Sequence, residues 1–247
     1  MTLLRLDHLT VRRGPCAVLS GISLSIGAGE CVGLIGPNGA GKTTLMRAAL
    51  GLMPMEGASS LAALSATARA AQAAWLPQSP EIAWPVTVRH LVSLGAMARG
   101  RPADHPSVQR ATDRMDLAAF CDRAANGLSG GEQARVLIAR AMAQDTPLLL
   151  ADEPVAGLDP AQQIRTMRAF RDLAAEGRSV LVSLHDLGLA ARHCTRIIVL
   201  HAGGLAADGS PAEVLTDELI AGVFGVTSYR AETAMGAVFQ PMDTVAP

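Results

Sequence analysis

The first part of the chain alternates between apolar and polar side chains. Residues 3–11 follow this pattern, and residues 17–26 repeat it, with apolar positions from Leu19 to Ile26. A period of two residues is typical of a half-buried β-strand. Because Arg13-Gly14-Pro15 separates the two segments, the pattern predicts an antiparallel β section at the N-terminus.

Continuous apolar runs follow further along the chain, at residues 31–35, 147–151 and 179–183. Runs of this length, bounded by glycine or polar residues, are typical of strands that are buried on both faces. Helices are expected over about 42–50, ending at Gly51, and over about 161–176. The alternation of strand and helix predicts a mostly parallel sheet, and therefore an α/β fold.

The middle of the chain, residues 86–145, reads mostly as helix. Val88, Leu91, Val92 and Leu94 fall on one helical face, and a second amphipathic segment covers about 108–120. The stretch Arg99–Pro106 contains proline and glycine and is expected to be a loop. The last dozen residues of the chain are expected to fray.

Composition narrows the class of protein. The chain has 247 residues, enough for one large α/β domain, with a net charge of −1 and 3% aromatic residues. Without a basic surplus or aromatic platforms, no nucleic-acid partner is expected. The longest uncharged stretch, Gly14–Gly29, is broken by proline, glycine and serine, so no membrane span is expected, and the N-terminus has no signal-peptide layout. Four scattered cysteines are expected to be reduced thiols.

A phosphate-binding loop is predicted directly after the run 31–35. Gly36-Pro37-Asn38-Gly39-Ala40-Gly41-Lys42-Thr43 fits G-x-x-x-x-G-K-[ST], and Thr44 follows in the same segment. Backbone N–H groups in such a loop surround phosphate oxygens, Lys42 neutralises the β- and γ-phosphates, and the Thr43 hydroxyl binds Mg²⁺. A chance glycine-rich turn is the alternative, and the flanking strand and helix disfavour it.

Two carboxylates end the second apolar run. Asp152 is predicted to hold the Mg²⁺ shell and Glu153 to polarise the attacking water, since neighbouring residues on a strand point to opposite sides. A strand that simply runs into a charged turn is the alternative. Together with the phosphate-binding loop, the two residues favour nucleotide hydrolysis.

Leu128-Ser129-Gly130-Gly131-Glu132-Gln133 adds a second predicted anion site. Ser129 and two glycines precede a helix, where free N–H groups and the helix dipole favour phosphate. Ser129 and Glu132 also fit a capping box, although a cap does not explain two glycines. This segment resembles the signature motif of ATP-binding cassette (ABC) transporter subunits.

Further residues match the same family in the correct order. Gln78 matches the Q-loop, Gly157-Leu158-Asp159 the D-loop, and His185, 32 residues after Glu153, the switch histidine. A lone histidine at that place would more often be structural. The resemblance covers residues 3–228 and implies that Gln78, Glu153 and His185 are catalytic, that Gln78 joins Thr43 and Asp152 at Mg²⁺, and that ATP is the nucleotide.

The resemblance also implies the architecture. We expect a single ABC ATPase domain over residues 1–247. A P-loop NTPase core with the antiparallel β section would occupy 1–85 and 146–247, and a helical signature subdomain would occupy 86–145. Two copies are expected to form a homodimer that drives a separate integral membrane permease through the surface near Gln78 and residues 79–95.

The sequence departs from the family pattern at two places. The family usually has an aromatic residue near position 13 that stacks on adenine, and here Arg12-Arg13 occupies that region. Arg13 or Arg12 is the candidate replacement, with a solvated arginine as the alternative. The Ala-rich span 54–76 lacks the usual glycine-turned hairpin, so the antiparallel sheet is expected to be shortened.

Within the family, the chain looks like importer ATPases for iron-siderophore, haem or cobalamin. The residues that indicate this are Ala83-Trp84-Pro85-Val86-Thr87-Val88, Ser183-Leu184-His185-Asp186-Leu187 and the tail around Val223–Val226. A substrate-binding protein would then be an indirect partner, and the chain would lie at the cytoplasmic face of the inner membrane. Zinc or manganese importers and exporters are the alternatives. A non-transport ABC protein, or a module that binds ATP without hydrolysing it, is a weaker one.

Overall fold

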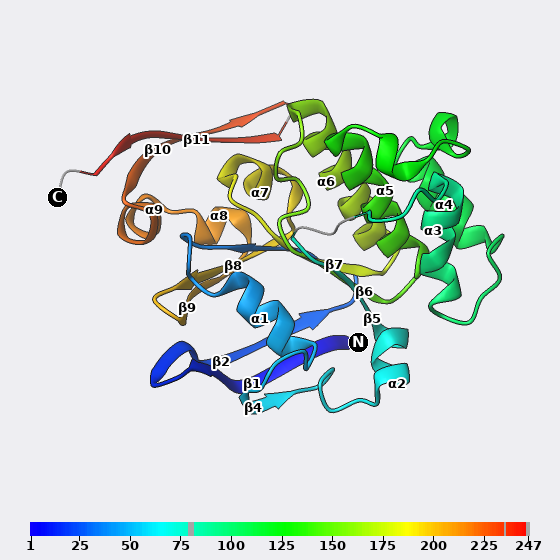
Figure 1. The fold of residues 1–247 in the computed structure, drawn as a ribbon. Helices are drawn as coiled ribbons and strands as arrows, with labels where there is room; N and C mark the ends of the chain where they lie inside the picture. Colours follow the sequence, from blue (N-terminus) through cyan, green and yellow to red (C-terminus); the bar gives the residue numbers. More distant parts are fainter. Residues whose placement is uncertain (79–81, 235, 246–247) are drawn as a thin grey trace.

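The computed structural model describes residues 1–78, 82–234 and 236–245, and Figure 1 shows their arrangement. The strands are β1 (Thr2–Arg13), β2 (Cys16–Gly27), β3 (Cys31–Ile35), β4 (Glu56–Ser59), β5 (Ala73–Leu76), β6 (Leu148–Ala151), β7 (Ser179–Ser183), β8 (Arg196–His201), β9 (Gly204–Gly209), β10 (Val226–Thr233) and β11 (Gly236–Thr244). The helices are α1 (Lys42–Ala49), α2 (Ala66–Gln72), α3 (Val88–Met97), α4 (Pro106–Arg114), α5 (Gly130–Ala143), α6 (Pro160–Ala175), α7 (Leu187–His193), α8 (Pro211–Val214) and α9 (Asp217–Phe224).

A six-stranded sheet in the order β5-β6-β7-β3-β8-β9 forms the centre of the molecule. Its first five strands run parallel to one another, and β9 pairs antiparallel with β8 at the edge. Because the carboxyl ends of parallel strands meet at one edge, the loops after β3, β5, β6 and β7 are brought together there. The predicted mostly parallel α/β fold is confirmed.

A second sheet, β2-β1-β4, is antiparallel and lies on one side of the central sheet (Figure 1). Residues 54–76, where the sequence lacks the usual hairpin, contribute to this sheet only the four-residue strand β4. The alternating apolar side chains of the antiparallel sheet, including Leu4, Leu9 and Leu19, are fully buried against α1.

The two faces of the central sheet belong to different cores. In β3, Val32 and Leu34 pack with α1 and the antiparallel sheet, whereas Cys31 and Ile35 pack with α3, α5, α6 and α7. Consequently α1 and α5, which begin at the two predicted anion sites, lie on opposite faces of the sheet (Figure 1). Among the described residues, no helix is long and apolar enough to cross a lipid bilayer.

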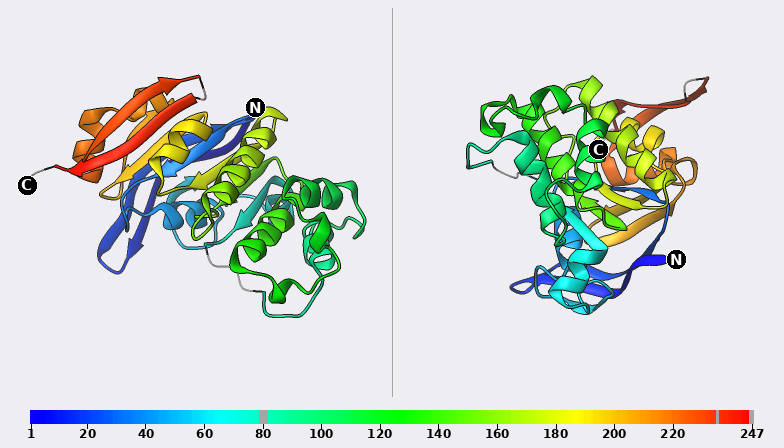
Figure 2. Two further views of the ribbon diagram at one scale, coloured as in Figure 1. Left: turned by 90° about the horizontal axis from the view of Figure 1, so that it is seen from above. Right: turned by 90° about the vertical axis from the view of Figure 1, so that its right-hand side faces the viewer.

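Residues 86–145 are mostly helical, as predicted, and Figure 2 shows them gathered at one end of the molecule. The amphipathic segment 108–120 is not one continuous helix. Helix α4 ends at Arg114, and Asp116 takes a positive φ of 53° before a short 3₁₀ turn at Ala118–Phe120. This break lets Met115 and Leu117 both reach the core, so the apolar spacing was correct and the helix length was wrong.

The C-terminal end is ordered, and the expectation that it frays was wrong up to Thr244. Strands β10 and β11 form an antiparallel hairpin, with Val226 paired to Thr244 and Thr233 to Gly236. Phe239 is buried against the core and fixes the hairpin to the body of the protein. Residues 246–247 lie outside the described part of the chain.

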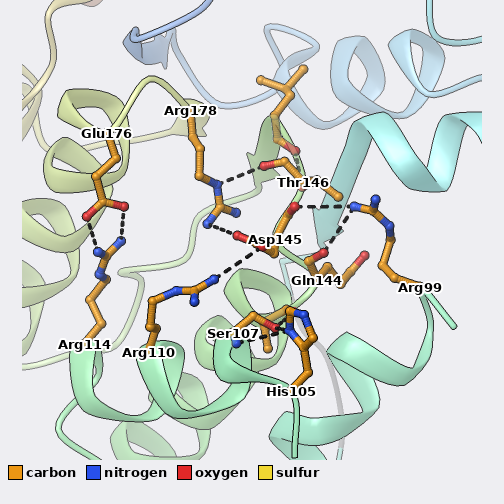
Figure 3. A network of polar contacts seen from close by, with 12 residues as sticks. Arg99, His105, Ser107, Arg110, Arg114, Gln144, Asp145, Thr146, Glu176 and Arg178 are labelled. Atoms are coloured by element: carbon orange, nitrogen blue, oxygen red, sulfur yellow. Dashed lines mark hydrogen bonds and ion pairs between the residues drawn. The ribbon is translucent and has the colours of Figure 1, made fainter. Parts of the chain in front are cut away.

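A polar network joins the helical segment to the core (Figure 3). Asp145, between α5 and β6, accepts from Arg101 at 3.0 Å, and from Arg110 and Arg178 at 3.4 Å each. Arg178 also donates to the Thr146 carbonyl at 2.9 Å. Burial acts to raise the pKa of Asp145, but the hydrogen bond from Arg101 and the nearby positive charges outweigh it, so the pKa is lowered from 3.8.

We expect Asp145→Asn to lower the free energy of unfolding by about 2 kcal/mol, because it leaves partly buried arginines without their anion. Asparagine tolerates the positive φ of 54° at this position, so the change removes the charge and one acceptor oxygen without straining the backbone. Urea denaturation measures the effect. Glu176→Gln is the control, because the Glu176 side chain that pairs with Arg114 is 51% exposed, against 27% for Asp145, and should contribute under about 1 kcal/mol.

The same network gives a pH dependence. A carboxylate whose pKa is lowered by folding stabilises the protein above its unfolded pKa, and that contribution disappears only as the pH falls through the lower, folded-state value. The difference between wild type and Asp145→Asn should therefore be equal at pH 7 and pH 5, both above 3.8. A difference that vanished between these pH values would contradict this assignment.

Candidate active site

The predicted phosphate-binding loop lies between β3 and α1, at the edge where the parallel strands end. Gly36 has a φ of 153°, and a Cβ atom there would lie 2.3 Å from the Leu200 carbonyl oxygen. Gly41 has a φ of 99°, and its Cβ would lie 2.7 Å from Leu19 Cδ2. Both positions require glycine, so the motif reflects the backbone of this loop as well as its chemistry.

Helix α1 is the helix in the described part of the chain whose N-terminus has no side-chain cap. Gly41 occupies its N-cap position, and no side chain accepts from the first N–H groups, whereas a side chain caps each of α2 to α9. Uncapped N–H groups at a helix start favour an anion, because they and the helix dipole point toward it. The start of α1 is therefore suited to phosphate.

Lys42 bends back over the same loop. Its side-chain Nζ donates to the Gly36 carbonyl at 2.8 Å and to the Pro37 carbonyl at 3.3 Å, and the residue is 6% exposed. Burial lowers the pKa of Lys42, and the negative charges of Glu153 and Asp152 partly offset this effect. The lysine thus shares one electrostatic environment with the two predicted carboxylates.

Asp152 follows the last residue of β6 and is completely buried. Its Oδ1 accepts from the Ser183 hydroxyl at 2.6 Å, and its N–H donates to the Leu76 carbonyl at 2.9 Å. Its Oδ2 has no hydrogen-bond partner among the described residues. A buried, unpaired carboxylate oxygen is costly unless a cation or a bound water satisfies it.

These residues fit a Mg²⁺ ion. Mg²⁺ usually keeps several waters and binds one or two protein oxygens together with substrate phosphates. The unpaired Oδ2 of Asp152 supplies one such oxygen, and the Thr43 hydroxyl at the start of α1 is the other candidate. When bound, the ion would neutralise charge on the phosphates.

Glu153 is the centre of a second cluster. Its Oε1 lies 2.6 Å from His185 Nε2, and its Oε2 accepts from Gln78 Nε2 at 2.7 Å. The Gln78, Glu153 and His185 side chains come from the loops after three different strands, β5, β6 and β7. The structure therefore brings together the three residues that the resemblance implied to be catalytic.

The sequence predicted that strand alternation would point the two adjacent carboxylates to opposite sides. The structure separates them in a different way. Strand β6 ends at Ala151, and Glu153 has a positive φ of 48°, which L-residues seldom adopt. The bend directs Asp152 into the core and Glu153 toward Gln78 and His185. Ser183, which the sequence analysis left without a role, accepts from the Glu153 N–H at 2.7 Å and holds this bend.

The signature segment lies at the start of α5, and Gly130 borders the same pocket as Gln78 and Glu153. Ser129 and Glu132 form the predicted capping box, with Glu132 Oε2 accepting from the Ser129 N–H and hydroxyl at 2.8 Å each. The hydrogen bond from the Ser129 side chain lowers the pKa of the Glu132 carboxyl. A Cβ atom at Gly130 would meet nothing within 4 Å, so that backbone is open to an approaching group.

Arg13 lies at the end of β1, in the hairpin next to the phosphate-binding loop, since Leu19 of that hairpin contacts Gly41. Arg12 is engaged elsewhere, because its Nε donates to Glu56 at 3.2 Å. Within the described residues, Arg13 makes no polar side-chain contact. The geometry therefore leaves Arg13, rather than Arg12, available to a ligand.

Fold and site together define a P-loop nucleotide-hydrolysing protein, with an uncapped helix start, a buried carboxylate that has one unpaired oxygen, and a second carboxylate held by histidine and glutamine. The family model described as ABC transporter matches residues 19–156. The chain therefore belongs to the ABC transporter family.

Curated relatives agree with this assignment. The Hemin import ATP-binding protein HmuV of Pseudomonas aeruginosa is 41% identical over 237 residues, which cover 91% of this chain and 93% of the relative. The Cobalamin import ATP-binding protein BtuD of Halobacterium salinarum is 41% identical over 242 residues, which cover 93% of this chain. The matched region spans only 61% of that longer relative.

Two solved structures share the fold. A metal-chelate type ABC transporter in an inward-facing conformation superimposes with a TM-score of 0.84 at 22% identity, covering 98% of each chain. A dimeric ATP-binding cassette with bound ADP and Pi, in a post-hydrolysis state, has a TM-score of 0.74 at 27% identity, covering 84% of this chain and 98% of the cassette.

Proposed function

We propose that this chain is the ATP-hydrolysing subunit of an ABC importer. The observation that carries the proposal is the Glu153 carboxylate, hydrogen-bonded to His185 and Gln78 beside the phosphate-binding loop. A carboxylate in this position can orient a water and accept its proton, while Lys42 and the start of α1 hold the phosphates. A module that only stores ATP would not need this cluster.

Catalysis would be shared between two copies that pack head to tail. Helices α1 and α5 lie on opposite faces of the sheet. Ser129, Gly130 and Gly131 at the start of α5 would contact the γ-phosphate held by the Gly36–Thr44 loop of the partner copy. The dimeric cassette with bound ADP and Pi supports the pairing of two copies.

The transported substrate would be a metal chelate such as haem, an iron-siderophore or cobalamin, because the relatives are named for hemin and cobalamin import. The chain would lie at the cytoplasmic face of the membrane, against a permease. A substrate-binding protein would deliver the substrate to that permease. Trp84 is 75% exposed near the Q-loop and would form part of the permease contact. Residues 79–81 of the predicted contact surface lie outside the described part of the chain.

Affinity purification of the chain from detergent-solubilised membranes tests this function. We expect the permease to co-purify, and phosphate release in reconstituted vesicles to rise when a haem-loaded or cobalamin-loaded binding protein is added. Stimulation by zinc-loaded or manganese-loaded binding protein alone would favour the metal-ion importer. Substrate export without any binding protein would favour the exporter.

For the adenine contact, we expect Arg13→Ala to raise the ATP dissociation constant about two- to fivefold, which corresponds to an exposed cation–π contact of about 0.5–1 kcal/mol. Arg12→Ala is the matched control and should have a smaller effect, because Arg12 is paired with Glu56. Fluorescent-nucleotide titration measures both constants. Unchanged affinity in the Arg13 variant would remove it from the site.

A further inference from the structure

Ser183 lies at the carboxyl end of β7, completely buried, between the strands that carry the phosphate-binding loop and the two carboxylates. Its hydroxyl Oγ is 2.6 Å from Asp152 Oδ1 and 2.7 Å from the Glu153 backbone nitrogen. One hydroxyl thus contacts both acidic residues, through the side chain of one and the backbone of the other.

The direction of these two hydrogen bonds is fixed. A backbone N–H can only donate, so the Ser183 oxygen must accept from Glu153. The single hydroxyl proton is then available for Asp152 Oδ1, which only accepts when it is ionised. Because Oδ1 is occupied in this way, Oδ2 is the Asp152 oxygen left for a cation, and it is buried without a hydrogen-bond partner among the described residues.

The bond to the Glu153 N–H has a separate consequence. Glu153 has a φ of 48°, and this bend turns its side chain toward His185 and Gln78. A fixed acceptor on the Glu153 amide stabilises a backbone conformation that a glutamate would otherwise seldom adopt.

We propose that Ser183 is a positioning residue that sets both the metal-binding oxygen of Asp152 and the orientation of Glu153. The inference deepens the proposed function and rests on it for the role of Glu153. Hydrogen-bond partners behind a metal ligand typically change metal affinity by about 10- to 100-fold when they are removed. Ser183→Ala should therefore weaken divalent-ion binding and slow hydrolysis, with little effect on ATP binding in EDTA.

The same strand offers a matched control. Ser179, at the opposite end of β7, is also buried, accepts from the Glu30 N–H at 3.1 Å and donates to the Gly27 carbonyl at 2.7 Å. Ser179→Ala removes the same kinds of bond from the same strand, far from the carboxylates. If Ser183 only stabilised the fold, the two alanine variants would behave alike.

The experiment measures Mn²⁺ binding to the protein–ADP complex by electron paramagnetic resonance, alongside phosphate release as a function of Mg²⁺ concentration. For Ser183→Ala, we expect the Mn²⁺ dissociation constant and the half-saturating Mg²⁺ concentration to rise about tenfold. Ser179→Ala should leave both at the wild-type values. Equal Mn²⁺ constants in wild type and Ser183→Ala, or an equal rise in the Ser179 variant, would overturn the proposal.

A second pair protects the test against misfolding. Ser183→Thr keeps the hydroxyl and Ser183→Val replaces it with a methyl group of similar shape, so any crowding affects both. The Ser183→Thr variant should bind Mn²⁺ about tenfold more tightly than the Ser183→Val variant, and equal Mn²⁺ affinities would overturn the proposal. If wild type bound Mn²⁺ with ADP but released no phosphate, the proposed function would fail while the Ser183 comparison remained decisive.

Discussion

Glu153→Gln will bind ATP with near wild-type affinity and hydrolyse it about 10²–10⁴ times more slowly, the usual cost of losing a catalytic base. An amide keeps the shape of the side chain but cannot accept the proton of the attacking water. The structure sharpens this expectation, because Glu153 is hydrogen-bonded on both oxygens, to His185 and to Gln78. An amide would present an NH₂ group to one of these partners in place of an acceptor oxygen.

Phosphate release and equilibrium ATP binding measure the two effects separately, and gel filtration with ATP should show a lasting dimer of the variant. Glu218→Gln, which removes the same charge from an exposed position in α9, is the control and should behave as wild type. Hydrolysis near the wild-type rate in Glu153→Gln would show that another group activates the water.

The second large expected effect is the recovery of ATP hydrolysis when two inactive variants are mixed. Lys42→Ala should lower hydrolysis about 10²–10³-fold, as expected for the loss of one group that stabilises transition-state charge. Ser129→Arg should be equally damaging if Ser129 contacts the γ-phosphate of the partner copy. In a heterodimer, one composite site receives both lesions and the other has an intact loop and an intact signature. Activity should therefore reappear on mixing if one intact site suffices.

Absence of hydrolysis in the mixture could also mean that two working sites are required. A crosslinking experiment therefore tests the shared site directly. Cys16 is the exposed cysteine of the four, and it would first be replaced by serine. Asn38→Cys in one copy and Ser129→Cys in the other should then join the two chains, and more so with ATP. A crosslink confined to one chain would overturn the shared site and leave the signature serine as a helix cap.

The motifs predicted much of the site because their spacing reflects the sheet. Glu153 and His185 each follow a predicted strand, and Gln78 follows β5, which the sequence did not predict. Parallel strands bring such positions to one edge, where Gln78 and His185 both contact Glu153. The role of Ser183 could not be predicted, because a serine at the end of an apolar run resembles any strand residue. Its role depends on the positive φ of Glu153, and no residue pattern in the sequence predicts that backbone conformation.

Two other features were missed for different reasons. The C-terminal hairpin is mostly exposed and anchored through Phe239, so residues 226–244 lack the apolar alternation that predicts strands. The network at Asp145 joins Arg101, Arg110 and Arg178, which lie 44, 35 and 33 residues from Asp145 in the sequence and reach it only after the helices have packed. Pairings of this kind follow from the tertiary structure and leave no local periodicity.

Asp145 and Ser129 lie at opposite ends of α5, so a rotation of the helix about one end displaces the other end. The helix has 14 residues, so a rise of 1.5 Å per residue separates its ends by about 21 Å. If the helical segment turns about the arginine-bound Asp145, a rotation of about 10° moves Ser129 by about 4 Å over that length. A small angular change at a fixed pivot would then suffice to bring the signature serine against a phosphate or withdraw it.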